Sequence, residues 1–270
     1  MAHKAATPLN KAGAANPMQD GRFAVRLAAS EADLRAAQKL RYDVFVRELG
    51  GDGPLVDHDA GLEQDRFDPH FDHLLLIDRD AGDSVVGAYR LLLGEKRAEV
   101  GQFYTDDEYD LDVLYQSGRK LLELGRSCLA PEYRGGEGMY HLFNGLARYV
   151  IENEVEILFG VASFHGTDPK ALAEPLSLLH HRHLAPEPLR VRARDAHYQS
   201  MNLLPEETID RRKAMLQVPA LLKAYLRLGG FVGDGAFVDH AFNTTDICLV
   251  MDTKRMSEAQ KSIYTKGVTV

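Results

Sequence analysis

The chain has 270 residues, of which 45% are hydrophobic and 8% aromatic, so it can bury the core of one large or two small globular domains. Its 40 acidic residues outnumber its 32 lysines and arginines and give a formal charge of -8, which argues against a general nucleic-acid binder. No uninterrupted apolar run is long enough to span a bilayer, and the N-terminus lacks the apolar core of a signal peptide. We therefore expect a cytoplasmic protein, for which contact with the surface of the inner membrane stays open.

The first part of the chain predicts a tail, a strand and a helix. Residues 1–21 are rich in Ala, Asn, Gly and Pro and predict a disordered tail, which leaves 22–270 as the folded domain. Alternating apolar residues at 23–27 predict the first strand. Ser30 is placed as the N-cap of the helix that follows, and the apolar stripe of this helix leaves Arg41 near its edge.

The middle of the chain predicts a hairpin followed by a strand, a glycine turn and a long helix. His73–Asp78 and Val85–Leu93 are expected to pair as antiparallel strands, and 102–118 reads as a short helical segment and loop. Glu123–Glu152 changes from an apolar strand to a glycine-rich turn and then to apolar residues at helical spacing. A fully apolar strand at 156–162 follows.

Residues 168–230 predict a helical insertion before a C-terminal hairpin. The hairpin strands are expected at 236–238 and 246–251. Three segments of the insertion carry helix signals, namely Pro169–His181, Pro205–Leu216 and Pro219–Leu228. The last of these helices is expected to face the core, and two alternatives are that it lines an acyl tunnel or rests on a membrane.

The glycine turn is a candidate phosphate site. Tyr133-Arg-Gly-Gly-Glu-Gly138 ends in the G-x-G spacing of a pyrophosphate loop, and a helix N-terminus offers N–H groups and a positive dipole end to an anion. An ordinary glycine turn before a helix is the alternative. A second glycine set at Gly230–Gly235 precedes a strand pattern and is interpreted as a turn.

A set of charged residues interrupts or flanks apolar sequence. Buried charges are costly unless they are paired, so this set predicts either ion pairs at a solvated rim or a charged pocket that grips an amino acid. Its members are Arg41, Asp65, Asp68, Arg90, Glu123 and Arg126. The two cysteines, Cys128 and Cys248, are expected to be buried free thiols. His180-His-Arg-His183 has no Cys or carboxylate at ligand spacing, so no metal site is expected.

Taken together, these motifs resemble a known enzyme family. The charged pattern resembles that of the acyl-homoserine-lactone synthases. These synthases depend on acyl carrier protein and are relatives of the GNAT N-acyltransferases. The residues that carry it are Arg41-x-x-x-Phe45, Glu63-x-Asp65-x-Phe67-Asp68, Arg90-Leu-Leu and Glu123-x-x-Arg126. Over about residues 23–252 the chain is more similar to the bacterial ornithine Nα-acyltransferases, which belong to the hemolysin-like branch of the GNAT superfamily. The synthases carry a tryptophan after the first helix, and this chain has none.

The resemblance implies an α/β GNAT fold, with a mixed central sheet flanked by helices and a helical insertion before the C-terminal hairpin. It implies transfer of a 3-hydroxyacyl group from acyl carrier protein to the α-amino group of L-ornithine, which gives lyso-ornithine lipid in the first step of ornithine lipid biosynthesis. An acyl-homoserine-lactone synthase or another amino-acid N-acyltransferase is the alternative. A second alternative is a non-catalytic module that binds acyl carrier protein or lipid.

The resemblance also suggests roles for individual residues. Glu123 would accept the amine proton, directly or through water. The amino acid would be bound by residues of the charged pattern, namely Arg41, Phe45, Asp65, Asp68, Arg90 and Arg126. No cofactor is expected to be tightly bound. The 4'-phosphopantetheine of the acyl carrier protein would lie on the glycine turn, at Arg134, Gly135, Gly136 and Gly138. Acyl carrier protein is acidic, so a basic segment of this chain is a candidate docking patch for it, and the alternative is an ordinary solvated face. The arginines of this segment are Arg182, Arg190, Arg192 and Arg194.

Overall fold

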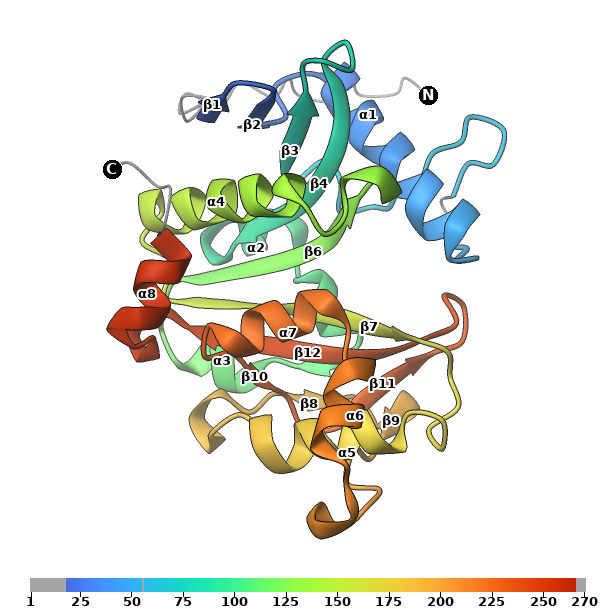
Figure 1. Cartoon of the computed structure of the whole chain (residues 1–270), viewed down its shortest axis with the longest axis vertical. Helices are drawn as coiled ribbons and strands as arrows, with labels where there is room; N and C mark the ends of the chain where they lie inside the picture. Colours follow the sequence, from blue (N-terminus) through green and yellow to red (C-terminus); the bar gives the residue numbers. More distant parts are fainter. Residues whose placement is uncertain (1–17, 55, 266–270) are drawn as a thin grey trace.

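A computed structural model describes residues 18–54 and 56–265, and its centre is one mixed sheet of ten strands (Figure 1). The strands follow the order β1-β2-β3-β4-β6-β7-β12-β11-β9, and β10 also pairs with β12. Their bounds are β1 Met18–Asp20, β2 Phe23–Leu27, β3 Asp72–Asp78, β4 Ser84–Leu93, β6 Leu121–Leu129, β7 Ile157–His165, β9 Tyr198–Gln199, β10 Phe231–Val232, β11 Ala236–Asp239 and β12 Thr244–Asp252. A second small sheet pairs β5 (Tyr109–Asp110) with β8 (Arg192–Ala193).

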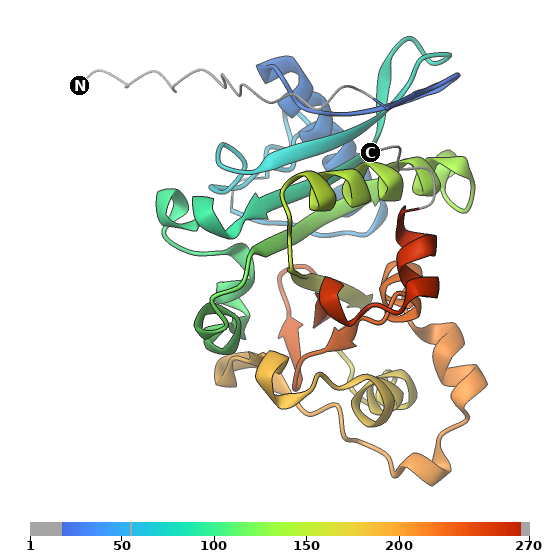
Figure 2. The same cartoon turned by 90° about the vertical axis from the view of Figure 1, so that its left-hand side faces the viewer.

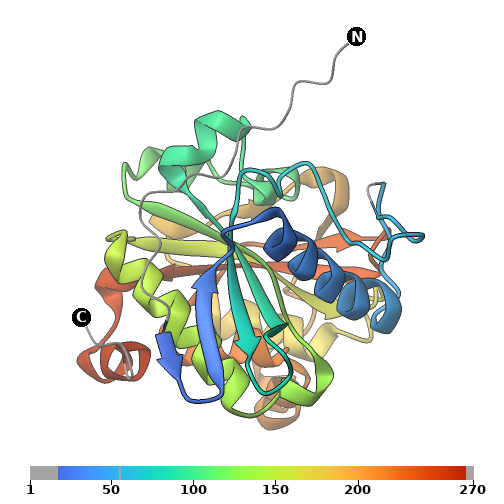
Figure 3. The same cartoon turned by 90° about the horizontal axis from the view of Figure 1, so that it is seen from above.

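The helices cover both faces of this sheet. Their bounds are α1 Glu31–Arg41, α2 Arg97–Val100, α3 Asp112–Gln116, α4 Glu137–Glu152, α5 Ala173–His183, α6 Arg211–Gln217, α7 Ala220–Arg227 and α8 Glu258–Thr265. Alternate residues of β3 show how the faces divide, because Leu74 and Leu76 join the core cluster of α4 whereas Leu75 and Ile77 join that of α1. Figure 3 shows α1 and α4 on opposite sides of these strands. In Figure 2, α8 lies beside α4, against which it packs.

The N-terminal boundary differs from the prediction. Residues 18–20, assigned from the sequence to a disordered tail, form β1 and pair antiparallel with β2. Backbone hydrogen bonds to an edge strand do not require apolar side chains, so composition gave no sign of this strand. The rest of the predicted tail, 1–17, lies outside the described residues.

Most of the predicted elements are confirmed in type. Ser30 caps α1 by accepting a hydrogen bond from the Asp33 N–H, and β3 and β4 form the expected antiparallel hairpin. The α1 helix continues as a π-helix over Tyr42–Glu48, which is a rare form that commonly marks functional sites. Residues 168–230 contain α5, α6 and α7 together with the short strands β8 and β9.

The strands β6 and β7 part from each other half-way along their length. They pair in parallel from Leu121–Ile157 to Glu123–Phe159, and both strands then continue without pairing to each other. Figure 1 shows them side by side at one end and apart at the other. Gly160 sits where they part, since a Cβ atom there would lie 2.0 Å from the Leu124 carbonyl oxygen.

A bulge in β6 lies next to this point. Its register with β4 shifts between the pair Arg90–Gly125 and the pair Ala88–Cys128, and Arg126 takes a φ of +50°. The bulge changes which face the following residues occupy. Leu124 and Leu129 both lie in the core cluster of α4, although their odd spacing would place them on opposite faces of a regular strand. The bulge therefore sets the direction of Arg126.

The contact between Gly160 and Leu124 predicts a clear effect of substitution. Gly160→Ala would push β7 away from β6, and we expect it to lower the free energy of unfolding by about 1–3 kcal/mol or more, measured by urea denaturation. Gly125→Ala in β6 is the control, because the nearest atom to its Cβ would be Arg90 Nε at 3.9 Å. Equal stabilities for the two variants would contradict this account of Gly160.

Candidate active site

A cavity of about 270 Å³ lies where β6 and β7 part. Residues 124–127 of β6 and 160–163 of β7 form its sides. Its remaining wall is partly apolar and partly charged. The apolar wall includes Phe45, Leu49, Tyr89, Leu221, Tyr225 and Phe242. The charged wall consists of Glu108, Arg126, Asp239 and Asp246. Such a cavity can hold an apolar chain beside a charged group.

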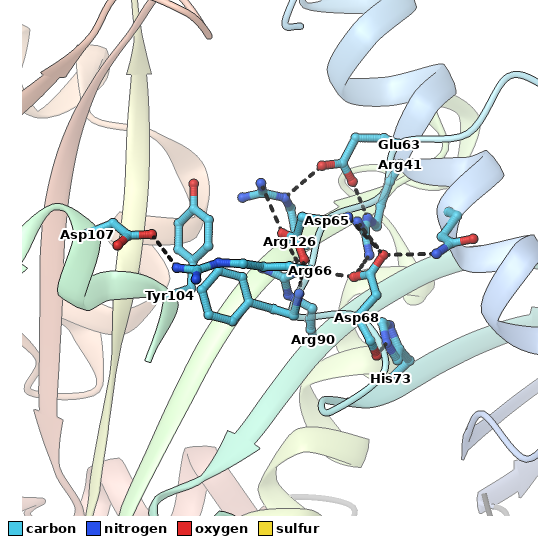
Figure 4. A network of polar contacts seen from close by, with 12 residues as sticks. Arg41, Glu63, Asp65, Arg66, Asp68, His73, Arg90, Tyr104, Asp107 and Arg126 are labelled. Carbon is cyan, nitrogen blue, oxygen red and sulfur yellow. Dashed lines mark hydrogen bonds and ion pairs between the residues drawn. The ribbon is translucent and has the colours of Figure 1, made fainter. Parts of the chain in front are cut away.

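The charged residues of the predicted pattern come together in one buried network, shown in Figure 4. Arg41, which lies near the edge of the predicted apolar stripe of its helix, is fully buried. Its Nε donates to Glu63, and its Nη1 and Nη2 donate to the two carboxylate oxygens of Asp68 at 2.7 and 3.2 Å. Arg41 thus ties α1 to the loop before β3 by a bidentate ion pair.

Arg90 and Arg126 complete this network. Arg90 Nη1 donates to Asp65 at 2.6 Å and to Asp68 at 2.9 Å. Arg126 Nε donates to Glu63 at 3.1 Å, and its Nη2 lies 3.6 Å from Asp65. Both guanidinium groups stack on the ring of Tyr104, at 5.5 Å for Arg90 and 4.7 Å for Arg126.

The three carboxylates of the network remain ionised. Burial alone would raise the pKa of Glu63, but the charges of Arg126 and Arg41 outweigh it and lower the pKa. In the same way, Arg90 lowers the pKa of Asp65 and Arg41 lowers that of Asp68, each against the effect of burial. Three carboxylates therefore balance three guanidinium groups, and the network is neutral as a whole.

Only part of the predicted amino-acid site reaches the cavity. Within the described residues, Arg126 and Phe45 line it, whereas Arg41, Asp65, Asp68 and Arg90 do not. The latter four are bound to one another behind Arg126. Through these contacts they brace the side chain that faces the cavity, and their contact with an amino acid stays a prediction.

Glu123 lies in β6 just before the strands part, and it is 1% exposed. Its Oε2 accepts a hydrogen bond from the Tyr104 N–H at 3.0 Å, and its Oε1 accepts one from the Thr105 N–H at 2.6 Å. Burial raises the pKa of Glu123 to about 7, against these hydrogen bonds. Glu123 is not part of the cavity wall. Its carboxylate holds the segment that places Tyr104 against Arg90 and Arg126.

The glycine turn has the geometry of a helix N-terminus without a side-chain cap. Gly136 is the N-cap of α4, and no side chain of the described residues caps the first turn there. Gly135 has a φ of +73°, and a Cβ on Gly138 would lie 3.0 Å from the Tyr133 carbonyl oxygen, so both positions favour glycine for conformation or space. Arg134 already pairs with Glu48 through two hydrogen bonds of 2.6 and 2.7 Å.

The four arginines of the predicted docking segment are exposed, but two of them are neutralised. Arg182 pairs with Glu206, and Arg192 lies 2.7 Å from Asp195. Arg190 and Arg194 donate to the backbone carbonyls of Ala185 and Asp106, and no ion pair engages either of them within the described residues. This segment therefore carries less free positive charge than its sequence implies.

Among the cavity residues that were not predicted as site residues are two buried acids, Glu108 and Asp246. Each is 4% exposed. Asp246 interrupts the apolar strand β12, which is a signal of the kind that singled out Arg126 in β6. Glu108 lies in an acid-rich segment, 102–118, that had no distinguishing pattern.

Comparisons with known proteins show which family the chain belongs to. Residues 40–144 match the model of the acetyltransferase (GNAT) domain family. The L-ornithine Nα-acyltransferase of Rhodobacter capsulatus is 58% identical over 91% of this chain and 96% of its own length. That of Brucella abortus is 41% identical over 90% of this chain and 89% of its own length. This chain belongs to the L-ornithine Nα-acyltransferase family.

The resemblance read from the sequence motifs is thereby confirmed. The predicted GNAT fold is confirmed as well, since the structure of FeeM, an N-acyl amino acid synthase from uncultured soil microbes, aligns with a TM-score of 0.52. That alignment covers 91% of this chain and 98% of FeeM at 13% identity, so it bears on the fold alone. Members of the family are named as acyltransferases, and this chain is an enzyme of that class.

Two further features bear on what the molecule can bind. Among residues 18–54 and 56–265, no helix combines the length and apolar character needed to cross a membrane. Over the same residues, no group of three or more His, Cys, Asp or Glu side chains is arranged to hold a metal ion.

The buried network makes Arg41 a strong determinant of stability. Arg41→Met would leave Glu63 and Asp68 buried with too little positive charge, and we expect it to lower the free energy of unfolding by about 3–5 kcal/mol. The control is Arg47→Met, which removes an exposed pair with Asp43 and should cost about 1 kcal/mol or less. Urea denaturation of both variants tests this, and similar losses for the two would argue against the bracing role.

Proposed function

We propose that this enzyme transfers an acyl group from the thioester of an acyl carrier protein to the α-amino group of L-ornithine. The observation that carries the proposal is the cavity at the parting of β6 and β7, where an apolar wall faces buried charges in a chain of this family. The apolar wall suits a fatty acyl chain, and the charged wall suits an amino acid. In its more specific form, the proposal is that the transferred group is a 3-hydroxyacyl group and that the product is lyso-ornithine lipid.

The chemistry needs the two substrates to meet in the cavity. The neutral α-amine attacks the thioester carbonyl, a C–N bond forms, the C–S bond breaks, and the carrier thiol leaves while the amine loses a proton. Beyond Glu123, β6 has no β7 partner, so its backbone groups on that side are open to the cavity. N–H groups in this position would polarise the thioester carbonyl.

Glu123 is our candidate for accepting the amine proton through water. Each carboxylate oxygen can accept a second hydrogen bond beyond the one it receives from the backbone, so a water chain from the cavity is compatible with its contacts. Its pKa of about 7 suits an acceptor that works near neutral pH.

The donor would be held at two places outside the cavity. The N–H groups at the start of α4, around Gly135, Gly136 and Gly138, would bind the phosphate of the phosphopantetheine arm, with Arg134 exchanging its Glu48 partner for that phosphate. The acidic carrier would dock on Arg190 and Arg194, whose charges no acid neutralises among the described residues. An amphiphilic product would be released at a membrane surface, which makes peripheral membrane contact part of the proposal.

The proposal predicts a defined product. Purified enzyme incubated with 3-hydroxyacyl carrier protein and ornithine should give Nα-acylornithine by mass spectrometry, while S-adenosylmethionine, lysine and glycine serve as alternative acceptors. Product from S-adenosylmethionine alone would favour a homoserine-lactone synthase, and no product with any amine would favour a non-catalytic binding module. Arg190→Ala should raise KM for the acyl carrier protein. Arg192→Ala should change this KM little, because Arg192 is already paired with Asp195 in the wild-type enzyme.

The role of Glu123 predicts a change in the pH profile. A base acts when it is deprotonated, so kcat of the wild-type enzyme should rise as the pH increases through about 7. Glu123→Gln should lower kcat by about 10²-fold or more and remove this rise. A variant that instead keeps the rise but has a higher KM and lower stability would show that Glu123 acts only by positioning Tyr104.

A further inference from the structure

The charge of the cavity is not balanced by the network behind it. The three arginines Arg41, Arg90 and Arg126 are matched by Glu63, Asp65 and Asp68, so this network has no positive charge to spare. The cavity wall adds three more acids, Glu108, Asp239 and Asp246, and its cation is Arg126, which the network already uses. Within the described part of the chain the cavity is therefore acidic.

Two of these acids have a carboxylate oxygen without a partner. Glu108 Oε2 and Asp246 Oδ1 are buried, and neither makes a hydrogen bond to a described residue. Asp246 Oδ2 accepts a hydrogen bond from Thr244 Oγ1 at 3.2 Å. An acceptor buried without a partner is costly, and an unpaired one in a cavity wall is commonly completed by a ligand.

The two carboxyls are held firmly relative to each other. Glu108 follows a 3-10 helix and its N–H donates to the Thr105 carbonyl oxygen at 3.1 Å. The next residue, Tyr109, is fully buried, and its hydroxyl donates to the backbone carbonyl of Asp246 at 2.9 Å. A site with this support is preorganised for its ligand.

The raised pKa values of Glu108 and Asp246 suit a cationic ligand. Burial and the neighbouring charge of Asp246 raise the pKa of Glu108 well above its ordinary value. Burial raises the pKa of Asp246 to about 6, and Asp239 adds to the effect. Arg126 opposes both shifts without cancelling them. A bound cation would favour the ionised form of both carboxyls.

We infer that Glu108 and Asp246 bind the side-chain ammonium group of the amino-acid acceptor and so select a cationic side chain. The inference rests on the proposed function. The α-amine has to be neutral when it attacks, so the ammonium group that two buried acids hold throughout the reaction is that of the side chain. Arg126 lies in the same wall and would take the α-carboxylate. A metal ion is the other cation such acids bind, but the described residues form no metal-ligand group here.

The test compares ornithine with norvaline, which has the same carbon chain without the terminal amine. Wild-type enzyme should prefer ornithine in kcat/KM by about 10²-fold or more, because norvaline leaves the two acids unpaired. Glu108→Gln and Asp246→Asn should each lower kcat/KM for ornithine by about 10²-fold while changing that for norvaline by about 3-fold or less. Glu207→Gln, an exposed residue outside the cavity wall, is the control and should change neither.

Several outcomes would overturn the inference. It would be overturned if the ratio of kcat/KM for ornithine to kcat/KM for norvaline were unchanged in both variants. Equal losses of kcat/KM for the two substrates would also overturn it, because they would indicate a catalytic or purely structural role. Calorimetric binding to the wild-type protein tests the inference without a variant, since equal Kd values for ornithine and norvaline would contradict it. If wild-type enzyme acylates no ornithine, the proposed function fails. If it acylates ornithine without discriminating norvaline, only this inference fails.

Discussion

The parallel ladder between β6 and β7 ends at the pair Glu123–Phe159, although the two strands continue to Leu129 and His165. Within the described sheet, this is the one place where two neighbouring central strands lack most of their backbone hydrogen bonds. The cavity lies between the unpaired parts of these two strands. A sheet opened in this way loses stabilising backbone hydrogen bonds, so the two strand ends need support from elsewhere. The α4 helix supports one face of β6, and α7 packs on β12 beside β7.

The buried ion network supports the other face of β6. It joins α1, the loop before β3, β4 and β6 through Arg41, Asp68, Arg90 and Arg126. Taking these charges out of water is tolerated only because they compensate one another, and this compensation makes the arrangement hard to alter one residue at a time. The network thus fixes the direction of Arg126, and among the described residues it leaves the acids of the charged wall with no cation that is not already paired.

The sequence singled out five of the six members of this network as site residues, all except Glu63, but it did not predict which of them faces the cavity. Charges that interrupt or flank apolar runs indicated either ion pairs at a solvated rim or a charged pocket. In the structure Arg41, Arg90 and Arg126 are all paired, and Arg41 and Arg90 are buried. Which of them faces a ligand depends on the bulge in β6, and a bulge leaves no mark in hydrophobic periodicity. The pairing of β12 with β7 brings Asp246 to the cavity from a distant part of the chain, so no local pattern could place it beside Glu108.

The role of Glu123 could also be predicted only in part from the sequence. Its type and its place in an apolar strand singled it out as a candidate proton acceptor, and in the structure its carboxyl is buried. Its contacts with the backbone of Tyr104 and Thr105 come from a segment that has little apolar periodicity, and the sequence therefore gave no reason to expect them. The choice between a proton acceptor and a support for Tyr104 depends on these contacts.

The bulge at Arg126 also constrains how this family can vary in length. Because the extra residue reverses the face of everything that follows it in β6, deleting or inserting one residue between Leu121 and Leu129 would exchange core and opposite-face side chains. Loops tolerate such changes, but this strand does not. Natural relatives should therefore keep the spacing across β6 constant even where their side chains differ, and an alignment that introduces a gap there would misassign the arginine of the cavity.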